Sequence, residues 1–262
     1  MSEWQSEDLD ALAEARQLLE HPGLAARFSH ALGGPIEAGM KRLPAGWRER
    51  VNGVTHSALQ QAVKAAVHTL NRDVQPKPAN RLHKLAVATS GGVGGFFGLP
   101  ALAVELPLST TVMLRAIADI ARSEGEALDT PDAQLACVTV FALGGEGGED
   151  DATDSGYFAV RAALAQSVTQ AAEHLATRGL SAEGAPVLVR LISAVAQRFS
   201  VQVSQKVAAQ AVPILGAAGG ATINTLFIDH YQQMARGHFI VRRLERHYGA
   251  EAVQDAYRAL AP

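Results

Sequence analysis

Apolar residues recur along most of the chain at the three- and four-residue spacing of amphipathic helices, and alternating β patterns are essentially absent. Glycine and proline separate these periodic stretches, as in His21-Pro22-Gly23 and Leu32–Pro35. The breaks predict helices over about residues 6–21, 23–32, 44–71, 100–124, 153–179, 186–213, 219–248 and 250–260, and one more from Pro131 behind a cap at Asp129-Thr130. The pattern therefore predicts an all-α, multi-helix bundle.

The clearest linker runs from Asp73 to Asn80 and contains two prolines. It predicts an N-terminal helical arm over residues 1–80 and a main all-helical domain over residues 81–262. A chain of 262 residues is within the range of a single domain, so we expect the two parts to form one compact unit.

Two glycine-rich apolar segments, residues 91–104 and 207–228, contain no charged residue. We expect them to form helical hairpins. Glycines at four-residue spacing let two helices approach closely, in a membrane or in a tight core. The candidate packing or membrane-contact glycines are Gly91, Gly94, Gly95, Gly98, Gly216 and Gly220.

Three interpretations of these segments stay open: a buried hairpin in a soluble protein, a hairpin that dips into a membrane, and a double membrane span. A charge at bilayer depth costs about 2.5–3.5 kcal/mol on insertion scales. Charge placement therefore favours the buried hairpin, because Glu105 and Arg115 follow the first segment closely. A phosphate cradle is rejected, since no Lys-Ser/Thr pair follows Gly98 and Phe97 replaces the third glycine of a dinucleotide fingerprint. No cofactor is expected.

Polar residues form a stripe on each of two otherwise apolar helices. At about 100° per residue, one stripe contains Glu105, Arg115 and Asp119, and the other contains Asn224, Tyr231, His238 and Arg242. Buried charges persist only when they are paired, so we expect Glu105 to meet Arg242 or His238, and Arg115 to neutralise Asp119. An architectural polar network, a ligand or metal site and a catalytic site all remain possible uses of these residues.

Composition and the absence of known motifs argue against several classes of partner and site. The formal net charge of −3 argues against nucleic acid as a partner. The single cysteine, Cys137, lies in an apolar run that would raise its pKa, which excludes a disulfide framework and disfavours a thiol nucleophile. Motifs of zinc hydrolases, serine hydrolases, kinases and EF-hands are absent, so no metal site and no catalytic residue is predicted. The acidic start of the chain lacks a secretory signal, and we expect a cytoplasmic location.

Several short motifs together resemble the EcsC family over about residues 81–248. They are Gly94–Pro100, Glu105–Pro107, Leu114–Ala118, Gly156–Arg161, Pro213–Asn224, Ala235–Phe239 and Arg242–Glu245. The family is named for the third product of a bacterial ABC-transporter operon linked to secretion. The resemblance implies a helical protein whose shared core includes positions 105, 115, 224 and 238, and it implies no catalytic residues. Glu105 departs mildly from the family, where aspartate is expected more often.

The leading hypothesis is a non-enzymatic helical protein, peripheral to the inner membrane, that acts through a membrane surface or a membrane protein in a transport-linked context. The uncharged segments and the basic end of the last long helix support it. One alternative is a carrier of a small apolar ligand, with a pocket between the hairpins gated by Glu105, Asn224 and His238. Another is a metal-assisted hydrolase that uses Glu105 and His238. The sequence indicates no oligomeric state.

Overall fold

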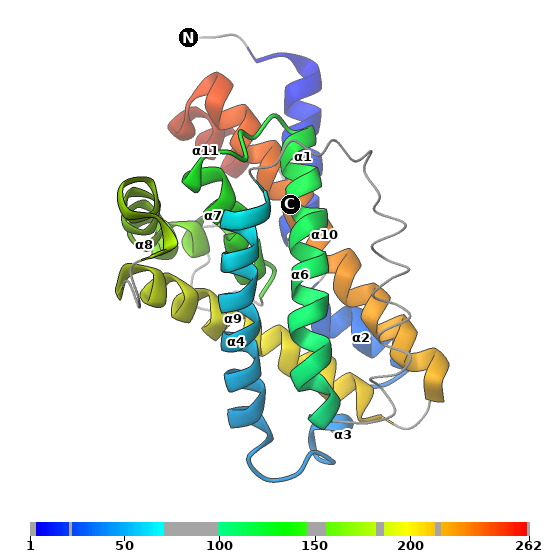
Figure 1. The fold of residues 1–262 in the computed structure, drawn as a ribbon. Helices are drawn as coiled ribbons and strands as arrows, with labels where there is room; N and C mark the ends of the chain where they lie inside the picture. The colour runs from blue at the N-terminus through cyan, green and yellow to red at the C-terminus, as the bar shows by residue number, and fades with distance from the viewer. Residues whose placement is uncertain are drawn as a thin grey trace.

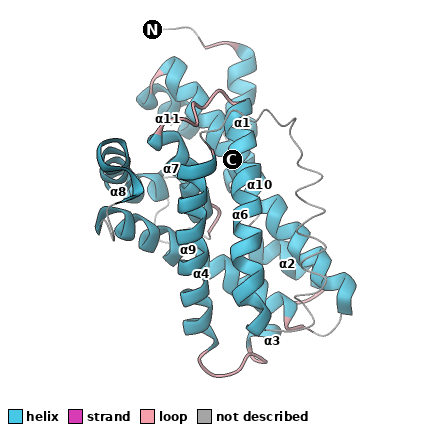
Figure 2. Ribbon diagram, viewed as in Figure 1, coloured by secondary structure: helices cyan, strands magenta, loops and turns pink. Residues whose placement is uncertain are grey.

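The computed structural model describes residues 4–20, 23–70, 99–145, 156–181, 186–212 and 216–260. Within these ranges all regular structure is helical, which confirms the predicted all-α fold (Figures 1 and 2). In chain order the elements are α1 (Ser6–Glu20), α2 (Leu24–Leu32), α3 (Glu37–Met40), α4 (Trp47–Thr69), α6 (Leu99–Ser123), α7 (Pro131–Thr139), η1 (Val140–Ala142), α8 (Gly156–Arg178), η2 (Gly179–Ser181), α9 (Pro186–Gln210), α10 (Gly216–Tyr248) and α11 (Ala250–Ala259).

Local sequence signals place several helix ends where they were predicted. The side chain of Thr130 caps α7 by accepting a hydrogen bond from the Ala133 amide, and Pro131 occupies the first helical turn. Gly33 ends α2 in the left-handed conformation, with φ of 65°. Gly179 follows α8 with φ of 62°, as expected for a glycine just past a helix end.

The start of one helix and the presence of one short helix are among the differences from the sequence analysis. The third predicted helix begins at Trp47 instead of Pro44, because Gly46 precedes it in the left-handed conformation, with φ of 74°. The short helix α3 was not predicted, since four residues are too few to show a helical period.

The linker at 73–80 and the glycines Gly91, Gly94, Gly95 and Gly98 lie outside the described residues. Gly216 begins α10, and Gly220 is buried one turn later.

Helix α10 is the longest described element and contacts α1, α2, α6, α9 and α11. Helix α4 packs against α6, α7 and α9, and Figure 1 shows α4 and α6 side by side. The N-terminal helices α1 and α4 therefore pack directly against helices of the predicted main domain. Buried apolar side chains from both parts join in one core cluster. Among the helices that the structure describes, none is both long enough and apolar enough to cross a membrane.

Helices α1 and α10 approach each other closely at Gly237. A Cβ atom at this position would lie 2.7 Å from Leu19 Cγ and 2.9 Å from the Ala15 carbonyl oxygen, both on α1. The absence of a side chain at Gly237 is therefore what lets α1 pack directly on α10, beside His238.

We expect Gly237→Ala to lower the free energy of unfolding by about 1–3 kcal/mol, because the added methyl group overpacks the α1–α10 contact. The matched control is Gly53→Ala on the exposed side of α4, where a Cβ meets nothing within 4 Å. That change should raise stability by up to about 1 kcal/mol through helix propensity. Urea denaturation measures both, and equal midpoints for Gly237→Ala and the parent protein would contradict the close approach.

Candidate functional site

The predicted polar stripe of α10 is largely buried, and its two halves differ in surroundings. Asn224 and Tyr231 lie in the first half, where the Tyr231 ring packs against Phe141, Phe199 and Phe227. His238 and Arg242 lie in the second half, among polar groups of other helices. The seven-residue spacing thus predicts which residues share a buried face, and in its second half Arg242 of this face binds carboxylates.

Glu105 pairs with Lys206 of α9 instead of with Arg242 or His238. Their side chains are buried, with 2.5 Å between Lys206 Nζ and Glu105 Oε1. The ammonium group also lies 4.9 Å from the centre of the Phe227 ring, a cation–π distance. The expected pairing of the two stripes through Glu105 is corrected accordingly, because helical period gives the face of a residue and not its neighbour.

The predicted ion pair between Arg115 and Asp119 is not formed among the described residues, and Asp119 pairs with Arg122 instead. Arg115 is exposed on α6, and Asp119 Oδ1 accepts a hydrogen bond of 2.9 Å from Arg122. The first stripe is therefore divided: Glu105 faces the interior, while Arg115 faces solvent. Glu105, Arg115 and Asp119 do not form one site.

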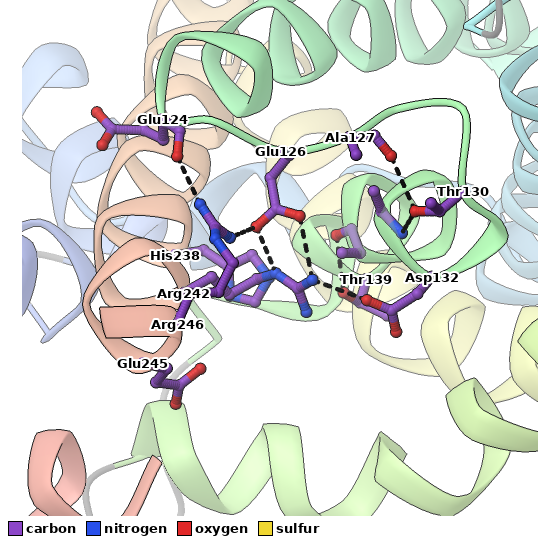
Figure 3. Close-up of polar contacts among 12 residues, drawn as sticks. Glu124, Glu126, Ala127, Thr130, Asp132, Thr139, His238, Arg242, Glu245 and Arg246 are labelled. Carbon is purple, nitrogen blue, oxygen red and sulfur yellow. Dashed lines mark hydrogen bonds and ion pairs between the residues drawn. The ribbon is translucent and has the colours of Figure 1, made fainter. Parts of the chain in front are cut away.

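A buried glutamate, Glu126, connects α10 to the segment between α6 and α7 (Figure 3). Arg242 donates to both of its carboxylate oxygens, from Nε at 2.9 Å and from Nη2 at 3.1 Å. Arg242 Nη2 also donates to Asp132 at 2.8 Å, and Arg246 donates to Glu126. Two-point pairing of this kind is the strongest ion-pair geometry that arginine makes with a carboxylate. It fixes the second half of α10 against the start of α7.

A second set of contacts links His238 to α8. The Tyr157 hydroxyl lies 2.9 Å from His238 Nδ1, and Arg161 Nη1 donates to the Tyr157 oxygen at 3.3 Å. Arg161 is itself held by Glu245, with hydrogen bonds of 2.6 and 2.9 Å to the two carboxylate oxygens. The order Glu245, Arg161, Tyr157, His238 forms one continuous relay of hydrogen bonds between α8 and α10.

This relay favours one tautomer of His238. Since Arg161 donates to the Tyr157 oxygen, the phenolic proton is available to be donated to His238 Nδ1, and burial raises the pKa of Tyr157 so that the phenol keeps it. Burial, with the nearby cations Arg161 and Arg242, lowers the pKa of His238 well below its usual value. The imidazole is then neutral and holds its one proton on Nε2. That nitrogen is buried and has no hydrogen-bond partner among the residues that the structure describes.

A cavity of about 160 Å³ lies between α7, α8 and α10, and His238 forms part of its wall. Most of the wall is apolar, with Leu143, Val160 and Leu164 among the lining side chains. Two further lining residues, Ala165 and Thr169, are exposed on α8, so the cavity opens to the surface on that side. A molecule in the cavity would lie against the histidine ring whose Nε2 lacks a partner.

The charges around the cavity are balanced. Arg161, Arg242 and Arg246 carry three positive charges, and the carboxylates that they bind, Glu126, Asp132 and Glu245, carry three negative charges. Each arginine that lines the cavity, Arg161 or Arg242, therefore already has a carboxylate partner. The site suits a neutral ligand better than an ion.

In the part of the chain that the structure describes, no side chains are grouped as a metal-binding site or around an activated nucleophile. No group of three or more histidine, cysteine or acidic side chains there is arranged to hold a metal ion. Glu105 and His238, the residues of the hydrolase hypothesis, bind Lys206 and Tyr157 respectively. Cys137 is buried, and burial raises the pKa of its thiol, as its apolar neighbours predicted.

Sequence reasoning missed the residues that complete the site. Tyr157 and Arg161 stand four residues apart at the start of α8, a spacing that places both on one helix face. Combined with the otherwise apolar start of that helix, this spacing is a signal that could have identified them. Glu126 and Lys206 carried no comparable signal, because the first lies in a connection and the second has no charged residue within one turn of it on α9.

We expect stability to fall as the pH falls below about 6.5, because His230 and His238 are buried as neutral groups. Burial, with Arg27 nearby, lowers the pKa of His230 to about 3. Both folded-state pKa values are depressed, so the unfolded chain takes up protons first. The stabilisation is complete above about pH 6.5 and is lost toward pH 3, at about 1.4 kcal/mol per pH unit for each histidine.

Urea unfolding at about pH 7, 6 and 5 measures this dependence. His238→Asn should remove the contribution of one histidine, since asparagine can still accept from Tyr157 in place of Nδ1. His68→Gln, at an exposed position of α4, is the matched control and should leave the slope unchanged. A slope that is the same in His238→Asn and the parent would show that His238 is not buried in neutral form.

Comparison with known proteins gives one match. The model of the EcsC protein family matches residues 16–244, from within α1 almost to the end of α10. No curated protein and no solved structure matches the chain. The family match begins upstream of residue 81, where the motif resemblance starts, and it contains every residue of the His238 cavity. The chain therefore belongs to the EcsC protein family, as its motifs predicted.

Proposed function

We propose that this protein binds a small, neutral, mainly apolar molecule in the cavity between α7, α8 and α10. The observation that carries the proposal is the buried Nε2 of His238, which has no partner within the described part of the chain and belongs to a residue of the cavity wall. Buried polar groups in folded proteins are almost always hydrogen-bonded, and an exception calls for an explanation. A bound molecule with a hydrogen-bond acceptor would explain this exception, because it would accept a hydrogen bond from Nε2.

The size of the cavity limits the part of the ligand that is enclosed. Cavities of about 150 Å³ with apolar walls hold benzene, and this one measures about 160 Å³. The enclosed part therefore contains roughly six to eight non-hydrogen atoms. The opening beside Ala165 and Thr169 allows a longer molecule to extend toward the surface.

The polarity of the wall defines the ligand class. Most of the lining side chains are apolar, and among the described residues the Nε2–H group of His238 has no hydrogen-bond acceptor. The lining arginines are already bound to carboxylates, so a second anion would have to displace one of them. A ketone, an ester carbonyl or an ether oxygen meets these requirements, and a carboxylate does not.

This proposal develops the ligand-carrier alternative with a different pocket. The sequence placed the pocket between the two glycine-rich hairpins, with Glu105, Asn224 and His238 as its gate. Of those three residues, only His238 lines the cavity. The pocket lies against α8, which contributes Val160, Arg161 and Leu164.

We expect cyclohexanone to bind more tightly than methylenecyclohexane, in which a CH₂ group replaces the carbonyl oxygen. One hydrogen bond of about 1.4 kcal/mol corresponds to a tenfold difference in Kd. Titration followed by amide chemical shifts of ¹⁵N-labelled protein measures both affinities, and the shifts should concentrate on residues of α7 and α8 that line the cavity.

Two variants make the test specific. His238→Asn should weaken cyclohexanone about tenfold and abolish the preference for the ketone. Ala165→Phe, at the exposed opening, should block both probes without unfolding the protein. His68→Asn on α4 is the control for an exposed histidine. Equal affinity for the two probes in parent and His238→Asn, or shifts away from the cavity, would contradict the proposal.

A further inference from the structure

One end of the molecule combines exposed apolar side chains with a basic connection. Figure 1 shows α3 and the first turns of α4 and α6 at this end, and α4 and α6 pack against each other. On α6, Val104 is 75% exposed and Leu108 is 54% exposed, one turn apart on the same face. A single exposed valine or leucine is ordinary, whereas two adjacent ones on an uncharged helix face form a patch.

The face that carries this patch has no charge because of the buried ion pair. Between residues 101 and 114 the sequence contains one ionisable side chain, Glu105. Its carboxylate points inward and binds Lys206. The outward positions of these turns, such as Ala103, Val104 and Leu108, are therefore apolar, and the first exposed charge on the helix is Arg115.

The neighbouring connection between α3 and α4 is positively charged. Residues 37–50 expose four cationic side chains, Lys41, Arg42, Arg48 and Arg50, and two acidic ones, Glu37 and Glu49. The local balance is +2 on a chain whose formal net charge is −3. Helices α4 and α6 also begin at this end (Figure 1), and a helix N-terminus carries partial positive charge.

We propose that this end docks on an anionic phospholipid surface. Val104 and Leu108 enter the boundary between headgroups and acyl chains, and the basic side chains of residues 41–50 lie against lipid phosphates. Peripheral attachment generally requires two contributions of this kind, apolar insertion and a basic patch. The surface is separate from the His238 cavity, so the inference does not depend on the ligand proposal.

Flotation of the full chain with vesicles tests the inference. We expect binding to vesicles of 30% phosphatidylglycerol in phosphatidylcholine, and weak binding to pure phosphatidylcholine. Each basic residue near an anionic surface contributes about a fivefold gain in partitioning. Arg42→Glu combined with Arg48→Glu should therefore abolish the preference for phosphatidylglycerol, and high salt should reduce it in the parent.

The apolar contribution has a matched control. Val104→Ser combined with Leu108→Ser should reduce vesicle binding about tenfold or more. Val189→Ser combined with Val201→Ser changes two exposed valines of α9 in the same way and should have no effect. Since all four side chains are exposed, each double variant should unfold at the same urea concentration as the parent.

Several outcomes would overturn the inference. They are failure of the parent to float with anionic vesicles, equal loss of binding in the two double-serine variants, and a dimer without lipid that Val104→Ser with Leu108→Ser converts to monomer. The last result would assign the patch to a second copy of the chain. His238→Asn should float like the parent, so failure of ligand binding and failure of membrane docking are distinguishable.

Discussion

Helix α10 is buried along most of its length, and the pairing of the charged side chains that it carries shapes the structure around it. Leaving a buried hydrogen-bonding group without a partner costs about 1–3 kcal/mol, and leaving a buried charge unpaired costs more. Glu126 therefore meets Arg242 and Arg246, and Tyr157 meets His238. These contacts hold α7, α8 and α10 around a shared space. Among the described residues, His238 Nε2, both ring nitrogens of His230 and the Tyr231 hydroxyl have no hydrogen-bond partner, and of these three residues His238 borders that space.

The buried pair of Glu105 and Lys206 applies the same constraint at a different place. It satisfies two charges in the interior, and it also leaves the outward face of the first turns of α6 without charge. One interaction thus links α6 to α9 and contributes to the chemistry of the surface opposite. The mainly apolar cavity at α7, α8 and α10 and the exposed apolar side chains of α6 are separate features, and they support the two separate proposals, binding of a small molecule and attachment to a lipid surface.

Much of the fold follows from local chemistry that the sequence displays. Thr130 with Pro131, and the glycines at 33 and 179, end or begin helices for steric and hydrogen-bonding reasons that need no tertiary context. Helical period also predicts correctly that Asn224, Tyr231 and His238 share a buried face. The EcsC motifs contain Tyr157, Arg161 and Glu245, although nothing in them indicated that these residues converge on His238.

The partners of the buried residues could not be predicted, because a period within one helix carries no information about the helix packed against it. Glu105 was expected to pair with α10, yet its partner is a lysine on α9. Glu126 lies between helices, where no period exists to indicate burial. The cavity depends on how the side chains of α7, α8 and α10 pack together. The volumes of side chains along the sequence do not reveal where that packing leaves a space.

The central claim is that neutral His238 holds its proton on Nε2 and that His238 borders a cavity that a ligand can enter. Long-range ¹H–¹⁵N correlation spectroscopy of the imidazole reports which ring nitrogen is protonated. The account predicts a neutral ring with protonated Nε2 and unprotonated Nδ1, unchanged from about pH 8 to about pH 5. A proton on Nδ1 in the neutral ring, or a doubly protonated imidazolium at about pH 6, would contradict it.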